Sequence, residues 1–172
     1  CKMMVKITEL SNQKNKNKFN LFVDGQFYAG ILKETAVANN FFVGKEIEQN
    51  RLNQILLESE TKQAFCKASD YLVSRIHTKQ ELKQKLTKKG FSCAAVKNAI
   101  NKLEEYGYID DTQFAKLFAE THKSLSKRML INKLISKGIL KQTALDIAEY
   151  LDINQIQTAT KVAEKYLKGK DV

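Results

Sequence analysis

The chain has 172 residues, 43% of them hydrophobic and 28% charged, with seven Gly, no Pro, no Trp and a formal net charge of +10. This composition is typical of a globular protein, and no apolar run approaches the length of a membrane-spanning helix, so we expect neither a membrane segment nor a secretory leader. Three scattered cysteines without a C-x-x-C pair and only two histidines argue against a disulfide framework and a zinc site, and favour the cytoplasm.

Alternating apolar and polar residues predict strands in the first part of the chain. The dipeptide Asp24-Gly25 lies between two such runs and is a strong hairpin signal, because Gly accepts the positive φ that a tight turn requires. No strand is expected after residue 48. The predicted elements are strands within 4–10 and 18–32, a polar connection at 11–18, a short helix near 33–40 and a turn at Gly44.

A helical period follows, with apolar residues three and four positions apart. Thr78 and Glu81 have the S/T-x-x-E form of a capping box, and Gly90 suits the left-handed residue that ends a helix. Ser92 and Asp110 are predicted to cap the next two helices. The predicted helices cover residues 49–57, 63–74, 79–89, 93–106, a segment from 110 that buries Phe114, Leu117, Phe118 and Leu125, then 128–137, 141–151 and 154–168.

These helices repeat with a period of about 48 residues. The shift places Leu82 on Leu130 and Gly90 on Gly138, and it also aligns Leu86 with the leucine 48 positions later. A fixed period of this length is typical of tandem helical repeats. We therefore predict a mainly α fold of three-helix repeats after a small domain that contains a β-hairpin. The predicted boundaries are 1–59 for this extension, 60–108 and 109–152 for two repeats, and 153–172 for the first helix of an incomplete third repeat.

Basic side chains gather in the helical part. Residues 1–60 contain eight Lys and Arg against seven Asp and Glu, whereas residues 61–172 contain 21 against 12. In the second helix of each repeat they recur in register, as Lys79 with Lys127, Lys85 with Lys133 and Lys89 with Lys137. Periodic basic positions suit a periodic acidic partner, such as a phosphate backbone or a helical protein filament. The alternative, that these lysines only keep one face soluble, stays open.

The sequence contains no recognisable catalytic constellation. There is no G-x-x-x-x-G-K-[ST], hence no P-loop, and neither histidine has a nucleophile at a known spacing. We expect helix capping at Asp110 and Asp111, packing between repeats at Tyr106 and Tyr108, and surface or boundary positions at His77 and His122. We therefore expect no enzyme activity, no cofactor and no metal site.

Three segments resemble the RecX family of regulatory proteins. They are YLVSRIHTKQELKQKLTKKGFS at 71–92, LEEYGYIDDTQFA at 103–115 and LINKLISKGI at 130–139. The strand-rich front part resembles the extension of Gram-positive members. The resemblance implies three tandem three-helix repeats and a non-enzymatic regulator of DNA repair that binds the RecA recombinase filament. Such proteins lie in the filament groove and obstruct strand exchange and ATP turnover.

The sequence departs from the family pattern at two places. The family's Arg-Arg before the capping box is Arg75-Ile76 here, and its Gly-containing turn is replaced by residues 123–126. Both places lie beside predicted basic helices. The candidate contacts to the RecA filament or to DNA are Arg75, Lys79, Lys83, Lys85, Lys89, Lys127, Arg128, Lys133 and Lys137.

The predicted mechanism is steric and competitive inhibition by a monomer whose basic contacts add through multivalency, with weak binding of single- or double-stranded DNA through the same faces. One alternative is a basic DNA-binding module of the helix-turn-helix kind. In that motif the second helix reads the groove, whereas here the first helix of each pair is the basic one. Another alternative is a scaffold array in which the hairpin domain is a docking surface.

Overall fold

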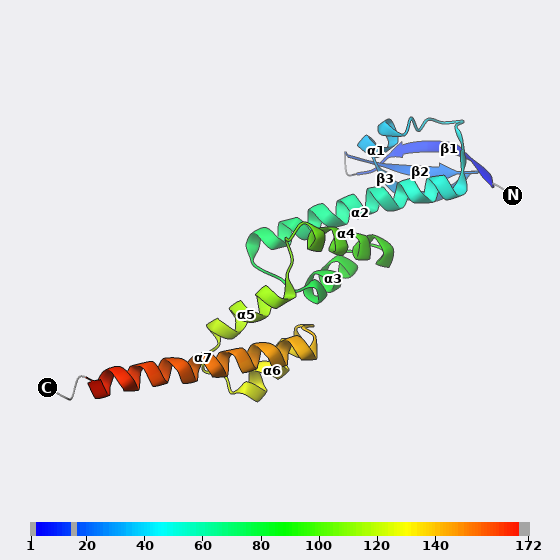
Figure 1. The fold of residues 1–172 in the computed structure, drawn as a ribbon. Helices are drawn as coiled ribbons and strands as arrows, with labels where there is room; N and C mark the ends of the chain where they lie inside the picture. The colour runs from blue at the N-terminus through cyan, green and yellow to red at the C-terminus, as the bar shows by residue number, and fades with distance from the viewer. Residues whose placement is uncertain (1–2, 15–16, 169–172) are drawn as a thin grey trace. The chain divides into compact units, whose positions relative to one another are not determined.

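The structure is a computed structural model that describes residues 3–14 and 17–168 (Figure 1). The chain divides into two compact units. The first unit comprises Cys1–Asp70 and Lys85–Lys102, and the second comprises Tyr71–Gln84 and Leu103–Val172. Each unit is therefore built from two separate stretches of the chain.

A four-stranded antiparallel sheet forms the front of the first unit. Its strands are β1 (Met4–Asn12), β2 (Lys18–Val23), β3 (Gln26–Leu32) and β4 (Glu46–Glu48), in the order β3-β2-β1-β4. The predicted hairpin is confirmed, but the polar connection is shorter than the predicted 11–18, because β1 extends to Asn12 and β2 begins at Lys18; residues 15–16 of it lie outside the described part of the chain. The short edge strand β4, which pairs Ile47 with Val5, was not predicted. Three residues are too few to display a period of two.

The hairpin between β2 and β3 has a primed turn. Asp24 and Gly25 have φ values of 49° and 82°, which match the right-handed twist of the two strands. The Asp24 carboxylate accepts a hydrogen bond from the backbone N–H of Lys6 at 3.0 Å, and the Thr8 hydroxyl accepts one from Gly25 at 3.0 Å. The turn is therefore fixed to β1 as well as by its own backbone.

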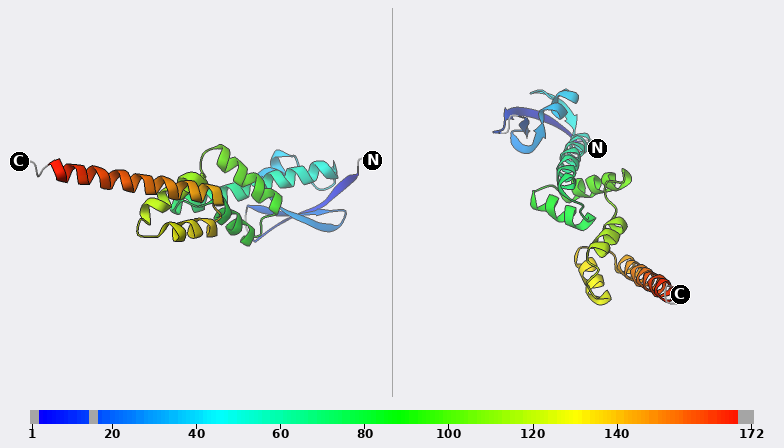
Figure 2. Two further views of the ribbon diagram at one scale, coloured as in Figure 1. Left: turned by 60° about the horizontal axis from the view of Figure 1, so that its bottom comes forward. Right: turned by 90° about the vertical axis from the view of Figure 1, so that its left-hand side faces the viewer.

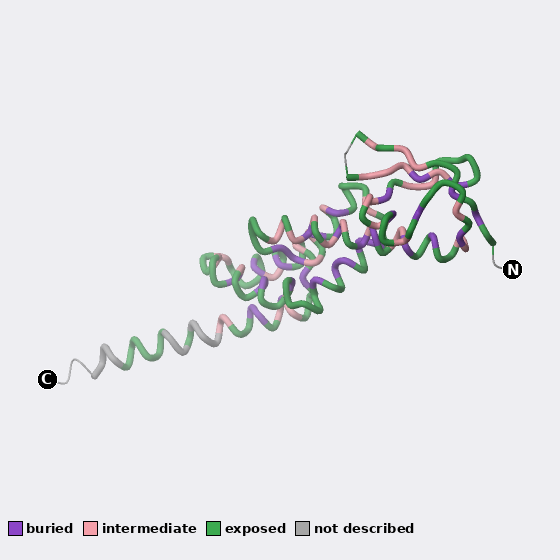
Figure 3. Tube along the Cα trace, turned by 90° about the horizontal axis from the view of Figure 1, so that it is seen from above, coloured by how far each residue is buried: buried purple, intermediate pink, exposed green. Residues whose placement is uncertain are grey.

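Two helices complete the sheet part of the first unit: α1 (Lys33–Ala38) and α2 (Gln49–Ser74). One face of the sheet packs against the first turns of α2, where the Tyr28 hydroxyl donates to Asn53 Oδ1 at 2.6 Å. Buried positions recur among exposed ones along α2 (Figure 3). The core residues are Val5, Ile7, Leu21, Val23, Ile31, Ala36, Phe41, Ile47, Leu52 and Ile55.

The prediction of two helices at 49–57 and 63–74 is wrong, because α2 is one helix of 26 residues. The polar segment between them contains no Gly or Pro that would end a helix. Ser59 and Thr61 within it are buried, and the Ser59 hydroxyl lies 3.0 Å from that of Thr35 on α1. Polar residues here are therefore part of the packing rather than a connection.

The predicted turn between α3 (Lys79–Lys88) and α4 (Cys93–Glu105) is confirmed. Gly90 has φ +91°, and Ser92 Oγ accepts a hydrogen bond from Ala95 N at 3.3 Å as the cap of α4. The Glu60 carboxylate on α2 holds the Ser92 backbone N–H at 2.7 Å and its hydroxyl at 2.6 Å. The start of α4 is thereby tied to α2 within the first unit.

The second unit contains three further helices: α5 (Asp111–Thr121), α6 (Lys127–Ser136) and α7 (Lys141–Lys168). Their apolar faces form one cluster, which the leucine stripe of α6 and small residues of α5 and α7 dominate. Small residues allow the helices to approach closely. The cluster comprises Phe114, Ala115, Ala119, Leu130, Leu134, Ile139, Ala144, Ile147 and Ala148.

The prediction of separate helices at 141–151 and 154–168 is also wrong. The chain continues as the single helix α7 of 28 residues (Figure 2). No Gly or Pro interrupts this segment, and Asp152 at the expected break pairs with Lys127 of α6 at 3.0 Å. A polar residue that looked like a helix end therefore serves as an ion-pair partner.

Several side chains lie elsewhere than predicted. His77 is buried, with 2% of its surface exposed; its ring meets that of Tyr71 edge to face, and its Nδ1 lies 3.0 Å from Glu81 Oε2. Tyr106 and Tyr108 do not seal packing: they are 63% and 62% exposed, and their rings contact each other edge to face at 6.0 Å. Leu117, expected in the core, is also exposed. Phe114 is buried, whereas Phe118, Leu125 and His122 are half-buried.

The mainly helical fold with a small antiparallel sheet at its front is confirmed. Repeat boundaries at 60–108, 109–152 and 153–172 stay a prediction. Within the described residues, no helix combines the length and apolar character needed to cross a membrane. No group of three His, Cys, Asp or Glu side chains suited to a metal ion occurs in 3–14 and 17–168.

Candidate functional site

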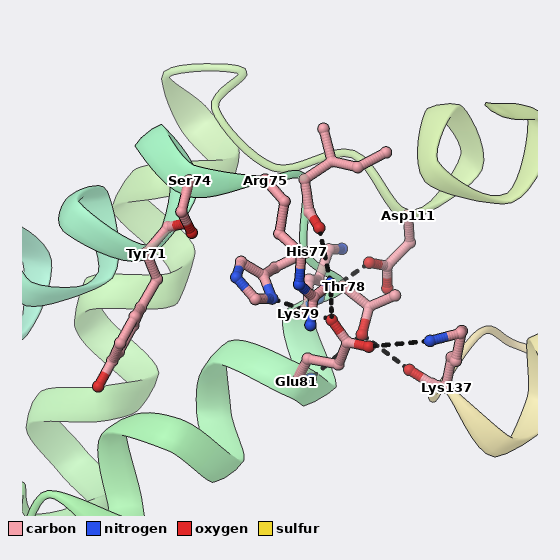
Figure 4. Close-up of polar contacts among 10 residues, drawn as sticks. Tyr71, Ser74, Arg75, His77, Thr78, Lys79, Glu81, Asp111 and Lys137 are labelled. Carbon is pink, nitrogen blue, oxygen red and sulfur yellow. Dashed lines mark hydrogen bonds and ion pairs between the residues drawn. The ribbon is translucent and has the colours of Figure 1, made fainter. Parts of the chain in front are cut away.

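The start of α3 is a junction between three segments of the second unit (Figure 4). Thr78 caps the helix, since its Oγ1 accepts a hydrogen bond from the Glu81 backbone N–H at 3.1 Å. The same hydroxyl donates to the carbonyl oxygen of Lys137, at the end of α6, at 2.7 Å. Thr78 is fully buried, so the end of α6 is held against the start of α3 without water between them.

A second cap comes from α5. The Asp111 carboxylate accepts a hydrogen bond from the Lys79 backbone N–H at 2.9 Å, and Asp110 caps α5 itself by accepting from Thr112 and Gln113 at 2.8 and 3.1 Å. Capping by this acidic pair is therefore confirmed, but the two carboxylates serve different helices. Both carry negative charge where the helix dipole favours it.

Glu81 is the centre of the junction. Arg75 Nη1 and His77 Nδ1 approach its Oε2 at 3.1 and 3.0 Å, and Lys137 Nζ approaches its Oε1 at 3.2 Å (Figure 4). The predicted capping box is thus formed only in part: Thr78 fulfils its role, whereas the Glu81 carboxylate binds three cationic or hydrogen-bonding side chains. One carboxylate holds together the loop before α3 and the end of α6.

The pKa of Glu81 is shifted by its burial and by these contacts. Burial raises the pKa, but hydrogen bonds from His77 and Lys137 and the charge of Arg75 outweigh burial and lower it to about 2. The carboxylate is therefore ionised throughout the physiological range. An acid this strong is unsuited to proton transfer near neutral pH, so the cluster suits a structural role rather than general acid–base chemistry.

Close packing at Gly138 completes the junction. Gly138 has φ +88°, and a β-carbon added there would lie 2.3 Å from Cβ of Gln80. Gly90, the residue in register with it, also has positive φ but has nothing within 4 Å of such a carbon. The two helix-ending glycines therefore share a backbone conformation, and only Gly138 is also needed for close approach.

The nine predicted contact residues fall into different environments. Four of them are engaged in ion pairs within the second unit: Arg75 and Lys137 with Glu81, Lys79 with Glu104, and Lys127 with Asp152. Lys137 also lies over the rings of Phe114 and Phe118, at 5.8 and 5.5 Å from their centroids. These four cations are therefore partly neutralised by the protein itself.

The other predicted cations are more accessible. Lys83 is exposed and Lys85 is half-buried. Lys89, Arg128 and Lys133 are exposed, and their side-chain cations make no hydrogen bond or ion pair with the residues that the structure describes. Lys89 lies in the first unit, and the other two lie on α6 in the second. We call these three residues the unpaired cations.

Sequence reasoning missed the central role of Glu81 and the burial of His77. A signal was present, because His77 and Glu81 are four residues apart and Arg75 lies just before them. Nothing in the sequence, however, indicated that Lys137 would reach the same carboxylate from 56 residues away. The second function of Asp111 depends on the same tertiary approach.

Comparisons with known proteins match both parts of the chain. The model of the regulatory protein RecX N-terminal domain matches residues 5–48, and that of the RecX first three-helix domain matches residues 64–103. A protein called regulatory protein RecX from Bacillus licheniformis is 33% identical over 169 residues, covering 94% of this chain and 64% of the relative. One from Listeria welshimeri is 30% identical, covering 95% and 63%. The chain thus spans slightly less than two thirds of the length of these relatives.

Two solved structures are also similar. A crystal structure of regulatory protein RecX has a TM-score of 0.56 at 21% identity, covering 86% of this chain and 74% of the other. A crystal structure of RecX from Lactobacillus salivarius has a TM-score of 0.51 at 25% identity, covering 62% and 71%. The first of these likenesses concerns the fold alone.

Proposed function

The chain belongs to the RecX family of regulatory proteins, and from this we propose that it binds the RecA filament on single-stranded DNA and inhibits its recombinase and ATPase activity. The protein would occupy the filament groove and obstruct it sterically, catalysing no reaction of its own. We expect it to act in the cytoplasm as a monomer.

One observation carries this proposal: similarity to regulatory proteins extends over 94% of the chain and includes both the sheet and the helical region. A match limited to the helices would fit many helical arrays, because three-helix units recur in proteins of unrelated function. The RecA filament itself comes from the resemblance of the three segments described above. The identity of the partner is therefore what the experiment below tests.

The charges of the helical region support a polyanionic or acidic partner. From Thr121 to Leu145 the sequence contains six basic residues and no acidic one. Contacts that are individually weak can add when they are held at fixed spacing on one chain. We propose that the unpaired cations contribute most to filament binding. A cation that is already paired must give up its ion pair within the protein before it can bind an acidic group of the partner.

The test is the rate of ATP hydrolysis by RecA on single-stranded DNA, titrated with this protein at fixed, moderate salt. Inhibition at less than one protein per RecA subunit would support a filament modulator. A parallel titration with DNA alone measures how much strand the protein sequesters, since its net charge ensures some salt-sensitive binding. Unchanged hydrolysis at saturation, or inhibition that only tracks sequestration of the strand, would contradict the proposal.

The alternative to this proposal is that the protein acts by binding DNA directly. The acid-free stretch that spans α6 favours phosphate contact on general grounds. Nuclease footprinting on duplex DNA separates the two: protection of one short sequence would indicate a sequence-specific DNA-binding protein, whereas uniform weak protection fits the proposal.

A further inference from the structure

A groove with a volume of about 600 Å³ lies within the second unit, where α3, α5 and α6 meet. Gln80 and Gln84 line it from α3, Phe118 and His122 from the end of α5, and Lys133 from α6. Its volume is in the usual range for sites that bind a small ligand or a single side chain with its flanking backbone. Neither the capping of the junction nor the packing of the core requires this space.

The groove offers one uncompensated positive charge. Lys137 also lines it, but its ammonium group is bound to Glu81, which lies in the same wall. Lys133 is exposed and its ammonium group makes no hydrogen bond or ion pair with the described residues, so its charge is available to a ligand. A single free cation beside a fixed carboxylate matches a monoanionic group better than a doubly charged phosphate group.

One wall of the groove is aromatic. The rings of Phe118 and His122 stack with centroids 4.0 Å apart and planes inclined by 18°. His122 Nδ1 lies 2.8 Å from the carbonyl oxygen of Phe118, which can only accept, so this nitrogen donates and the ring is held in place. A fixed aromatic pair gives a surface on which the methylene groups of a side chain can pack.

Helix α3 lines the groove with amides. Gln80 and Gln84 are four residues apart on α3 and are both exposed. Each side-chain amide provides N–H donors and a carbonyl acceptor, which is the combination that the N–H and C=O groups of a peptide backbone require. A nucleic-acid backbone has acceptors but no N–H donors, so half of this capacity would be unused.

We propose that this groove binds a glutamate side chain of an acidic peptide segment. The carboxylate would bind Lys133, the methylenes would pack on Phe118 and His122, and the peptide groups would bond to the amides of α3. The identity of the partner, an acidic surface segment of the recombinase, rests on the proposed function. The chemistry of the groove does not.

The test uses a fluorescein-labelled hexaglutamate peptide, with fluorescence anisotropy measured on the whole chain at moderate salt. Lys133→Glu should weaken binding about tenfold or more, because a charge-assisted hydrogen bond is replaced by repulsion. Gln84→Glu, which leaves Lys133 in place, should weaken it in the same direction. Lys116→Glu is the matched control: Lys116 is exposed on α5 but does not line the groove, and we expect its variant to bind as the parent does. Far-UV circular dichroism confirms that each variant is folded.

Two results would overturn the inference. Equal losses of peptide affinity in Lys116→Glu and Lys133→Glu would mean that binding depends only on the net charge of the protein. Loss of binding to a labelled oligothymidylate in Lys133→Glu, with peptide binding unchanged, would make the groove a nucleic-acid contact. A hexa-aspartate peptide should bind more weakly than hexaglutamate, because its shorter side chain cannot reach past the rings, and equal affinity would count against the aromatic wall. No recombinase is present in these assays, so their failure would leave the proposed function standing.

Discussion

Helices α3 and α6 are built to the same pattern, yet they differ in how they use their charges. Each has ten residues, is capped by a hydroxyl at its start and ends at a glycine with positive φ. The main difference lies at the third helical position, which is Glu81 in α3 and the exposed Met129 in α6. Glu81 also binds Lys137 at the end of α6, whereas Lys89, in register with Lys137 at the end of α3, has lysine instead of a carboxylate at the position 56 residues before it, Lys33. The repeat thus reproduces backbone and packing, whereas the roles of the charges depend on neighbours.

Substituting alanine for each of the two helix-ending glycines, Gly90 and Gly138, should give the largest difference in stability between the two helices. Both substitutions impose positive φ on a residue with a β-carbon, at about 1 kcal/mol. Only Gly138→Ala also forces the end of α6 away from Gln80, and overpacking of this kind adds about 1–3 kcal/mol. Urea denaturation should therefore show a total loss of about 3 kcal/mol for Gly138→Ala and about 1 kcal/mol for Gly90→Ala. Equal losses would mean that the close approach is absent in solution.

Substituting the residue at the third helical position of each helix by that of the other should give the next largest difference in stability. Glu81→Met leaves Arg75, His77 and Lys137 without their shared carboxylate, and we expect a loss of about 2–3 kcal/mol in the free energy of unfolding. Met129→Glu completes the S-x-x-E pattern after Ser126 on an exposed turn, so it should be neutral or slightly stabilising. A stable Glu81→Met variant would show that the cluster contributes nothing net to stability.

The pH dependence of the free energy of unfolding should reveal the contribution of the Glu81 carboxylate. The pKa of Glu81 is lowered from 4.5 to about 2 in the folded protein, so its contribution is complete above about pH 4.5 and is lost as the pH falls towards 2. The loss for this group amounts to at most about 3 kcal/mol. Other carboxylates titrate in the same window, so the measurement is the difference between the parent and Glu81→Met. The two stability curves should converge as the pH falls, and parallel curves would contradict the assignment.

Removing the capping hydroxyls should have the smallest effects. Ser126→Ala removes one cap at the start of α6 and should cost about 1 kcal/mol. Thr78→Ala removes the cap of α3 and also leaves the Lys137 carbonyl without its donor, so about 2 kcal/mol is expected. Thermal unfolding of the two variants side by side measures the difference. A larger effect at Ser126 would mean that the second bond of Thr78 does not form.

Features that depend on residues close together in the sequence were predicted correctly, whereas features that depend on residues far apart were missed. Asp24-Gly25, Gly90, Ser92 and Asp110 were predicted correctly, because each acts on backbone groups within a few residues. Continuity of α2 and α7 was missed, since polar residues at the expected breaks, such as Ser59, find partners on other elements. The same limit applies to the site: the basic residues were found as a set, but their partners were not.

Charge reversal of the unpaired cations tests the central claim most directly. Lys89→Glu, Arg128→Glu and Lys133→Glu are combined in one chain, and the control combines Lys97→Glu, Lys116→Glu and Lys161→Glu, which reverses three exposed lysines outside the proposed contacts. The measurement is the protein concentration that halves ATP hydrolysis by RecA on single-stranded DNA. We predict an increase of about tenfold or more for the first variant and little change for the control, with both thermal midpoints near that of the parent. Equal increases in both variants, or none in the first, would contradict the claim that unpaired cations on this repeat scaffold contact the filament.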